Sequence, residues 1–143
     1  NTPEEVVIAG ETAACERVIK TLGCDAFRAP FDHVIHCEPM QSEYEELVKV
    51  NTLPTSKKLP DATFYSALEH KPIVLESNAI AHRVAKVRCS QLDFLQLVNK
   101  VYSDGAKIFI EAGAGSVCSR WIDKILDGKE HLTVSLNRRG VDD

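Results

Sequence analysis

The sequence has 143 residues, of which 44% are apolar and 27% charged, as in an ordinary globular domain with a hydrophobic core. Its formal net charge of −4 gives no electrostatic reason to expect binding to nucleic acid or to an acidic membrane. No apolar run is as long as a membrane span, and no signal peptide is visible. Five cysteines, an odd number without a Cys-x-x-Cys pair, argue against a disulfide framework and predict a reducing, cytoplasmic setting.

The N-terminal segment predicts a strand, a helix and a second strand. Val6–Ala9 is a short apolar run, mostly β-branched, which is typical of a buried strand. Ala13–Leu22 carries apolar side chains at helical spacing and stops before Gly23, and Ala26–Ala29 predicts the next strand. Because the chain starts at Asn1 without a Met, directly in front of a strand, we expect it to be part of a longer polypeptide.

The segment from Ala29 to Met40, APFDHVIHCEPM, predicts the end of a strand, a turn and the start of a helix. Pro39 falls in the first turn of that helix, where a missing N–H has no cost. His36 therefore lies between two regular elements that would hold its side chain in place. Fixed geometry is the first requirement of a general base, so His36 is a candidate catalytic base. A structural or surface histidine is the alternative.

The same segment holds other side chains that bind metals or react. His33 and His36 could be two metal ligands, with Glu38 or Asp32 as a third. Their spacing differs from the i, i+4 pair of zinc proteases and no further ligand cluster follows, so no metal site is expected. Cys37 neighbours His36 on an extended chain, where adjacent side chains point to opposite faces. A small buried side chain is therefore favoured over a catalytic dyad.

Beyond Met40 the pattern predicts helices and strands joined by polar loops. Leu92, Leu95, Val98 and Val101, for example, recur at the spacing of one helix face. The expected elements are a helix at Met40–Val50, a loop at Asn51–Asp61, a strand at Ala62–Leu68, a turn at Glu69–Pro72, helices from Ser77 or Asn78 to Val87 and over Gln91–Tyr102, a strand at Ile108–Ile110, a helix at Val117–Leu126 and a last strand at Thr133–Leu136.

A glycine turn, Gly113-Ala114-Gly115-Ser116, joins the expected strand at Ile108–Ile110 to the helix that follows. Strand, glycine turn and helix form the layout of a phosphate-binding site, so a nucleotide-binding α/β domain using Gly113–Gly115 is an alternative function. The third glycine of G-x-G-x-x-G would fall at Cys118, and no β-α-β unit with an acidic residue about twenty positions on is evident. A tight turn that lets the helix pack close to the strand is the other interpretation.

His36-Cys37-x-x-Met40 resembles the second active-site motif of malonyl/acyl-CoA:acyl-carrier-protein transacylases, His-Ser/Cys-x-x-Met. Asn1–Gly10, Thr63–Ser66 and Phe109–Gly115 are similar, in the same order, to three strand motifs of that family. The resemblance extends from Asn1 to about Leu126. The C-terminal piece, residues 118–123 and 131–143, looks most like acyltransferase domains of polyunsaturated-fatty-acid synthases and related polyketide synthases.

The resemblance implies the C-terminal part of a hydrolase-like α/β acyltransferase fold, with about half of its inserted ferredoxin-like small subdomain. The implied division places the partial small subdomain at residues 1–30 and the large subdomain at 31–128. A terminal strand and linker would occupy residues 129–143.

The implied activity moves an acyl or malonyl group from coenzyme A to an acyl carrier protein, in fatty-acid or polyketide synthesis, through an acyl-serine intermediate. Carried over to this chain, the general base is His36, and Asn1 matches the family's Asn near the acyl pocket. The implied substrates are acyl-CoA or malonyl-CoA, no cofactor is bound, and the partner carries phosphopantetheine. Other domains of a multidomain synthase are the further partners implied.

Departures from the family pattern limit what this chain does alone. The family's nucleophile lies in a Gly-His-Ser-x-Gly elbow, and this sequence has no G-x-S-x-G and no Arg shortly after one. Many malonyl-specific members carry a Gln-Leu pair in the corresponding helix, whereas this chain has Val87 and Arg88 ahead of Gln91-Leu92. This difference puts a malonyl preference in doubt. Ala114 stands in the glycine turn where the family usually has Pro. We therefore expect this polypeptide to be inactive alone and to self-associate through unpaired strand edges. A non-catalytic scaffold or carrier-docking region is the alternative.

Overall fold

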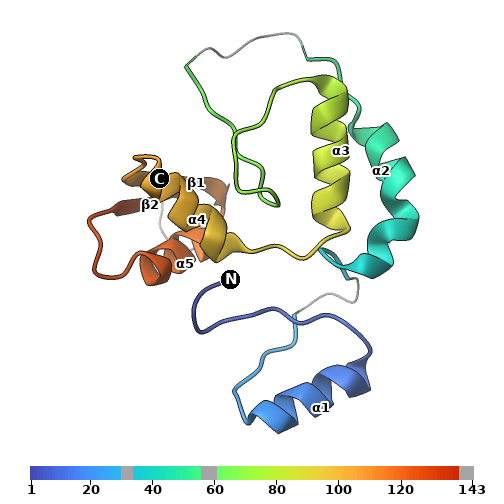
Figure 1. Ribbon diagram of the computed structural model, residues 1–143. Coiled ribbons are helices and arrows are strands. Elements are labelled where there is room, and N and C mark those ends of the chain that lie inside the picture. The colour runs from blue at the N-terminus through green and yellow to red at the C-terminus, as the bar shows by residue number, and fades with distance from the viewer. Residues whose placement is uncertain (30–33, 56–60, 139–143) are drawn as a thin grey trace. The chain divides into compact units, whose positions relative to one another are not determined.

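The computed structural model describes residues 1–29, 34–55 and 61–138. The chain divides into two compact units, each described by itself. The first, here called the sheet unit, comprises Asn1–Val6, Tyr65–Ile73 and Asp93–Asp143. The second, here called the helical unit, comprises Val7–Phe64 and Val74–Leu92. Figure 1 labels the elements in chain order, which are α1 (Thr12–Leu22), η1 (Glu38–Glu43), α2 (Tyr44–Asn51), α3 (Ser77–Arg88), α4 (Phe94–Ser103), β1 (Ile108–Ala114), α5 (Val117–Ile125) and β2 (Leu132–Asn137).

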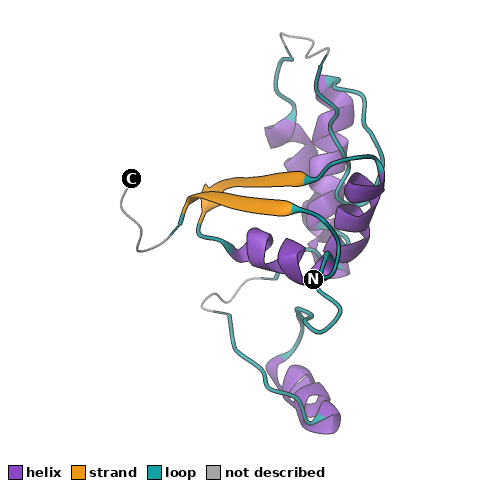
Figure 2. Ribbon diagram, turned by 90° about the vertical axis from the view of Figure 1, so that its left-hand side faces the viewer, coloured by secondary structure: helices purple, strands orange, loops and turns teal. Residues whose placement is uncertain are grey.

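In the sheet unit, β1 and β2 pair in parallel and are joined by α5. Figure 2 shows the two strands side by side. In their register, Ile108 lies opposite Leu132 and Ile110 lies opposite Val134. Residues alternate between the two faces of a strand, and Phe109 is half-buried on the face that packs against the helices. The buried core consists of Val98, Ile122, Ile125 and Leu126, with Phe94, Leu95, Tyr102 and Phe109 packed against it.

In the helical unit, α2 lies against α3 (Figure 1). The contact is close because Ala81 and Ala85, one helical turn apart on α3, are fully buried and carry only methyl groups. The hydroxyl of Tyr44 and Nδ1 of His82 lie 2.9 Å apart and form a hydrogen bond between the two helices. This pair of helices forms the support on which the candidate site is built.

The helices agree well with their predicted positions, because each has an apolar face at helical spacing. α3 and α5 match the prediction to within one residue at each end, whereas α4 begins three residues later than expected. Its start is set by Asp93, whose carboxylate accepts a hydrogen bond from the backbone N–H of Gln96 at 2.8 Å. The helix expected from Met40 begins with a 3-10 segment, η1, that has Pro39 in its first turn, and continues as α2.

Three predicted strands are wrong. Val6–Ala9 and Ala26–Ala29 have no strand structure, and Val6, Val7 and Phe27 are 76%, 75% and 97% exposed. Ala62–Leu68 contributes a single antiparallel bridge, from Tyr65 to Pro72. A strand is stable only when a neighbour pairs with its N–H and C=O groups, and the described residues supply no such neighbour for these segments. The turn predicted at Glu69–Pro72 begins two residues earlier, at residues 67–69, and is closed by the N–H of His70 donating to the carbonyl of Ser66 at 2.9 Å.

Within the described ranges, no helix is long and apolar enough to cross a membrane.

Candidate active site at His36

His36 follows an irregular segment and directly precedes Cys37 and η1 in the helical unit. Its backbone N–H donates to the carbonyl of Arg88 at 2.8 Å. Its ring Nδ1 lies 2.8 Å from the carbonyl oxygen of Val87. Both carbonyls belong to the end of α3, so that two successive peptide groups hold the backbone and the ring of one histidine. The predicted support is thus corrected: a helix C-terminus, not the end of a strand, positions His36.

The partner of Nδ1 decides which nitrogen of His36 carries the proton. A carbonyl oxygen can only accept, so Nδ1 must be the donor, and in the neutral ring Nε2 then has a free lone pair. No hydrogen bond to Nε2 is formed by any residue that the structure describes. The ring is half-buried, so Nε2 is held in one orientation and remains open to a reacting group. This is the arrangement that a general base requires.

The end of α3 explains why these carbonyls are available. The last carbonyl groups of an α-helix have no partner within the helix, and they form the negative end of its dipole. His36 satisfies two of them, those of Val87 and Arg88. The helix terminus therefore orients the ring.

The backbone of His36 has φ of 59°, in the left-handed region that a histidine seldom adopts. Such a conformation costs on the order of 1–3 kcal/mol and persists only where its surroundings hold it. Here the hydrogen bonds to the end of α3 provide that hold. Strain of this kind concentrates at functional sites, where it directs a side chain to a place that ordinary backbone would not reach.

The cysteines near His36 do not form a catalytic dyad with it in the described structure. Cys37 is half-buried, and its side chain has no hydrogen bond to the described part of the chain. Cys89 is buried, and its thiol donates to the carbonyl of Met40 at 3.1 Å. Burial raises the pKa of Cys89, and the neighbouring Cys37 raises it further. Cys89 is therefore a protonated, structural thiol at neutral pH.

Asn1, the predicted substrate-binding residue, belongs to the sheet unit, whereas His36 belongs to the helical unit. The backbone nitrogen of Asn1 donates to the carbonyl of Glu5 at 2.9 Å, which closes a short turn around the buried Thr2. Glu5 in turn accepts hydrogen bonds from the indole of Trp121 at 2.9 Å and from Lys124 at 2.5 Å. The bond from Lys124 is the main reason that the pKa of Glu5 is lowered. Asn1 is thus tied to α5, and its role toward substrate stays a prediction.

The metal interpretation of this segment depends on His33 and Asp32, which lie outside the described residues. Among the residues that are described, no three His, Cys, Asp or Glu side chains gather closely enough to hold a metal ion.

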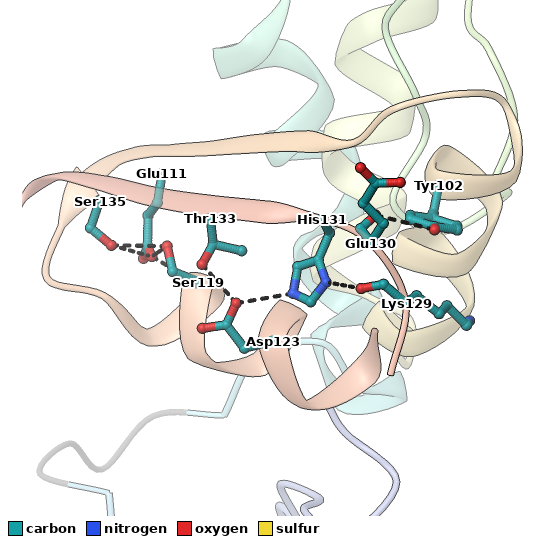
Figure 3. Close-up of polar contacts among 9 residues, drawn as sticks. All are labelled: Tyr102, Glu111, Ser119, Asp123, Lys129, Glu130, His131, Thr133 and Ser135. Carbon is teal, nitrogen blue, oxygen red and sulfur yellow. Dashed lines mark hydrogen bonds and ion pairs between the residues drawn. The ribbon is translucent and has the colours of Figure 1, made fainter. Parts of the chain in front are cut away.

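The glycine turn in the sheet unit is closed by a carboxylate (Figure 3). Glu111 accepts hydrogen bonds from the backbone N–H of Ser119 at 2.8 Å, from the Ser119 hydroxyl at 2.8 Å and from the N–H of Cys118 at 3.2 Å. The hydroxyl of Ser135 adds a contact of 3.4 Å. Burial acts to raise the pKa of Glu111, but these hydrogen bonds outweigh it, and the pKa is lowered. Glu111 is therefore an ionised cap on the first turn of α5.

This cap bears directly on the nucleotide-binding alternative. β1, α5 and β2 form a parallel β-α-β unit from the strand, helix and strand that the sequence predicts. In dinucleotide-binding proteins, however, the helix N-terminus receives a pyrophosphate and an acidic residue ends the second strand. Here Glu111 already occupies the N–H groups of Cys118 and Ser119, and β2 ends at Asn137. A phosphate bound by these N–H groups would have to displace the half-buried Glu111 carboxylate, so the geometry favours the structural turn.

No protein-family model and no curated protein matches the sequence. Solved structures do match. The malonyl CoA-acyl carrier protein transacylase from Clostridium perfringens has a TM-score of 0.70 and 24% identity, over 90% of this chain and 40% of the transacylase. The acyltransferase domain from the second module of the salinomycin polyketide synthase has a TM-score of 0.73 and 23% identity, over 92% of this chain and 31% of that chain. A type II polyketide malonyl-transacylase, solved with its acyl-carrier protein, has a TM-score of 0.73 and 21% identity, over 90% of this chain and 42% of that chain.

The chain has the acyltransferase fold. It spans less than half the length of each of these three structures. The α/β class and the expected match to one part of an acyltransferase domain are confirmed. The division at residues 30 and 128 stays a prediction, as does the half ferredoxin-like subdomain, whose two expected strands are not formed in this chain.

Sequence reasoning located His36 but not the groups that orient it. Val87 and Arg88 act through backbone carbonyls, and they lie 51 and 52 positions further along the chain. Any residue type can supply a carbonyl, so no sequence pattern marks these two positions. The only signal is indirect: the end of a predicted helix always carries unpaired carbonyl groups.

Proposed function

We propose that this chain is part of an acyltransferase domain that moves an acyl or malonyl group from coenzyme A to an acyl carrier protein, with His36 as general base. The acyltransferase fold supports the reaction class. The complex of a transacylase with its carrier protein, found among the similar structures, supports the choice of acceptor. The nucleophilic serine lies outside these 143 residues, since no G-x-S-x-G elbow is present.

The observation that carries the proposal is the hydrogen bond from Nδ1 of His36 to the carbonyl of Val87. It leaves Nε2 free to take a proton from the serine hydroxyl while the serine oxygen bonds to the thioester carbon. The C–S bond then breaks, and the imidazolium returns the proton to the sulfur of coenzyme A. In the second half, Nε2 takes the proton of the pantetheine thiol, the new thioester forms, and the serine oxygen leaves and is reprotonated. The carbonyl at α3 takes the orienting place that an aspartate has in a serine triad.

The decisive experiment measures intact mass after incubation with malonyl-CoA and, separately, with a longer acyl-CoA. It compares this chain with a polypeptide extended upstream of Asn1 to include the elbow serine. We expect only the longer polypeptide to gain an acyl group and to pass it to a carrier protein. Label on Cys37 or Cys118 of the shorter chain would contradict the proposal. Burial, followed by the charge of Glu111, raises the pKa of Cys118, which makes it a poor nucleophile at neutral pH.

His36→Asn in the longer polypeptide tests the base itself. Asparagine tolerates the left-handed backbone, and its side-chain amide can still donate to the carbonyl of Val87, so the fold should persist. The variant lacks a basic nitrogen, and loss of general base catalysis reduces acyl transfer by roughly 10²–10⁴-fold. His82→Asn on the same unit is the matched control and should transfer at the wild-type rate. Unchanged transfer by folded His36→Asn would instead favour a non-catalytic scaffold.

A scaffold or carrier-docking region remains the second candidate because the chain holds only one member of the catalytic pair. It predicts binding of the carrier protein without acyl transfer in any form of the polypeptide. The acyltransferase proposal also includes membership of a polyunsaturated-fatty-acid synthase and a cytoplasmic location. The C-terminal sequence pattern supports the first, and the five cysteines, none of them in a disulfide, support the second.

A further inference from the structure

A cavity of about 310 Å³ lies between α5 and β2 in the sheet unit. Its wall on the α5 side includes Ser116, Ser119 and Arg120, and its wall on the β2 side includes Ser135 and Arg138. The carboxyl end of a parallel strand and the helix packed beside it are a common place for ligands in α/β folds. The volume is at the lower end of the range for small-molecule sites.

Two arginines give this cavity its positive charge. Arg120 and Arg138 are exposed, and neither forms an ion pair with any described residue. A guanidinium group remains charged at all physiological pH values, and its planar set of N–H donors matches the oxygens of a phosphate or carboxylate. Both guanidinium groups line one cavity, so a single small anion could accept hydrogen bonds from the two of them.

The acidic side chains nearby are already engaged (Figure 3). Asp123, on the wall of the cavity, accepts from the hydroxyl of Thr133 at 2.7 Å and lies 3.2 Å from Nε2 of His131. Glu111 is held by the N–H groups and hydroxyl at the start of α5. Neither carboxylate forms an ion pair with the two arginines. Two arginines and one carboxylate therefore line the cavity, so its positive groups outnumber its negative ones.

The hydroxyl groups divide into two sets. Thr133 donates to Asp123, and Ser119 and Ser135 donate within the network around Glu111. The side chain of Ser116, in contrast, makes no capping hydrogen bond on α5. It is the hydroxyl of the cavity wall that is free to donate to a ligand.

We propose that this cavity is a binding site for a phosphate-type oxyanion, held by the guanidinium groups of Arg120 and Arg138 and by the hydroxyl of Ser116. The site uses side chains and does not depend on the N–H groups at the start of α5, which Glu111 occupies. The site lies in the sheet unit, and the proposal does not rest on the proposed acyl transfer. The anion is either free phosphate or the phosphate monoester of an organic molecule.

The test is an NMR titration of the ¹⁵N-labelled chain at constant ionic strength, with inorganic phosphate in one arm and pantetheine 4′-phosphate in the other. We expect saturable shifts in the amide signals of residues 116–123 and 133–138. Tighter binding of the pantetheine ester would identify an organic phosphate as the ligand, and equal binding would identify the free ion. Absence of saturable shifts in both arms would overturn the proposal.

Arg120→Gln and Arg138→Gln should each weaken binding about tenfold, since each removes a charge-assisted, two-pronged contact. Lys71→Gln removes one positive charge from the same unit at a residue that does not line the cavity, and should bind as tightly as the wild type. Equal weakening by all three variants would show a general charge effect and overturn the site. A second measurement needs no variant: bound phosphate should protect Arg120 and Arg138, but not Arg88, from modification by phenylglyoxal. Modification at an unchanged rate would equally contradict the proposal.

Discussion

His36 and His70 share a left-handed backbone conformation, with φ of 59° and 52°. In His36 this conformation allows both the backbone N–H and the ring to form hydrogen bonds to the end of α3, and these bonds orient the ring. His70 is different: its backbone N–H closes a turn onto the carbonyl of Ser66 at 2.9 Å, but its ring Nε2 is buried without a hydrogen bond. The same strain therefore has a proposed catalytic use at one position and none that the structure reveals at the other.

We expect His70→Gly to raise the free energy of unfolding by about 1 kcal/mol, because glycine adopts positive φ without steric cost and the unpaired nitrogen is removed. Chemical denaturation followed by circular dichroism measures the change. Lys86→Gly is the control, because this exposed residue lies inside α3 at ordinary helical φ. That substitution should lower stability by about 1 kcal/mol. A loss of stability in both variants would show that the His70 ring contributes packing that outweighs the strain.

At the scale of single elements, the helices were predictable and several strands were not. α3 and α5 bury one face each, and that face can be predicted from the spacing of their own apolar residues. A strand depends on a neighbour, and the run Val6–Ala9 contains nothing that says whether one is present. β1 and β2 form because each supplies the other's hydrogen bonds, and α5 brings them together in parallel.

Glu111 shows how an element boundary can depend on a residue in another element. This carboxylate lies on β1 yet caps the start of α5, so the capping residue precedes the helix by several positions. The usual capping position, Ser116, makes no side-chain cap. Capping patterns include only residues next to the helix start, so the sequence did not show that Glu111 occupies the N–H groups there. For that reason the glycine turn could equally be interpreted as a phosphate site.

Glu111→Gln should destabilise the sheet unit by about 1–3 kcal/mol at neutral pH, because hydrogen bonds to a charged acceptor are replaced by weaker ones. The pKa of Glu111 is lowered in the folded chain from an ordinary value of 4.5. Its contribution is therefore fully present above that value and is lost as the pH falls through the lower folded pKa. Thermal unfolding between pH 7 and pH 3 should show a smaller acid destabilisation for the variant than for the wild type.

The exposed Glu16→Gln on α1 serves as the control for this experiment and should leave both the stability and its pH dependence unchanged. Equal acid sensitivity of the wild type and Glu111→Gln would assign the low-pH loss to other carboxylates. Glu5 and Asp104 are the candidates, since lysine partners lower the pKa of each.

At the scale of the whole molecule, the chain matches less than half of the acyltransferases that share its fold. In this chain the outer face of the β1–β2 pair is apolar and exposed to solvent. Ile108, Ile110, Leu132, Val134 and Leu136 are between 38% and 63% exposed on that face. In the described residues the sheet has two strands, so each strand also has an open edge. Contiguous apolar surface and free edges favour association.

We therefore expect the isolated chain to self-associate at micromolar concentration, and the outer face of β1–β2 to be the contact. Ile110→Thr combined with Leu132→Thr should shift the chain toward monomer, because threonine keeps the strand propensity while reducing the apolar area. Light scattering across a concentration series measures the state. Val74→Thr combined with Leu53→Thr changes a pair of apolar residues in the helical unit that are 64% and 65% exposed, and should leave association unchanged. A wild-type chain that is monomeric throughout the series would show that these faces do not meet, and equal dissociation by both double variants would place the contact elsewhere.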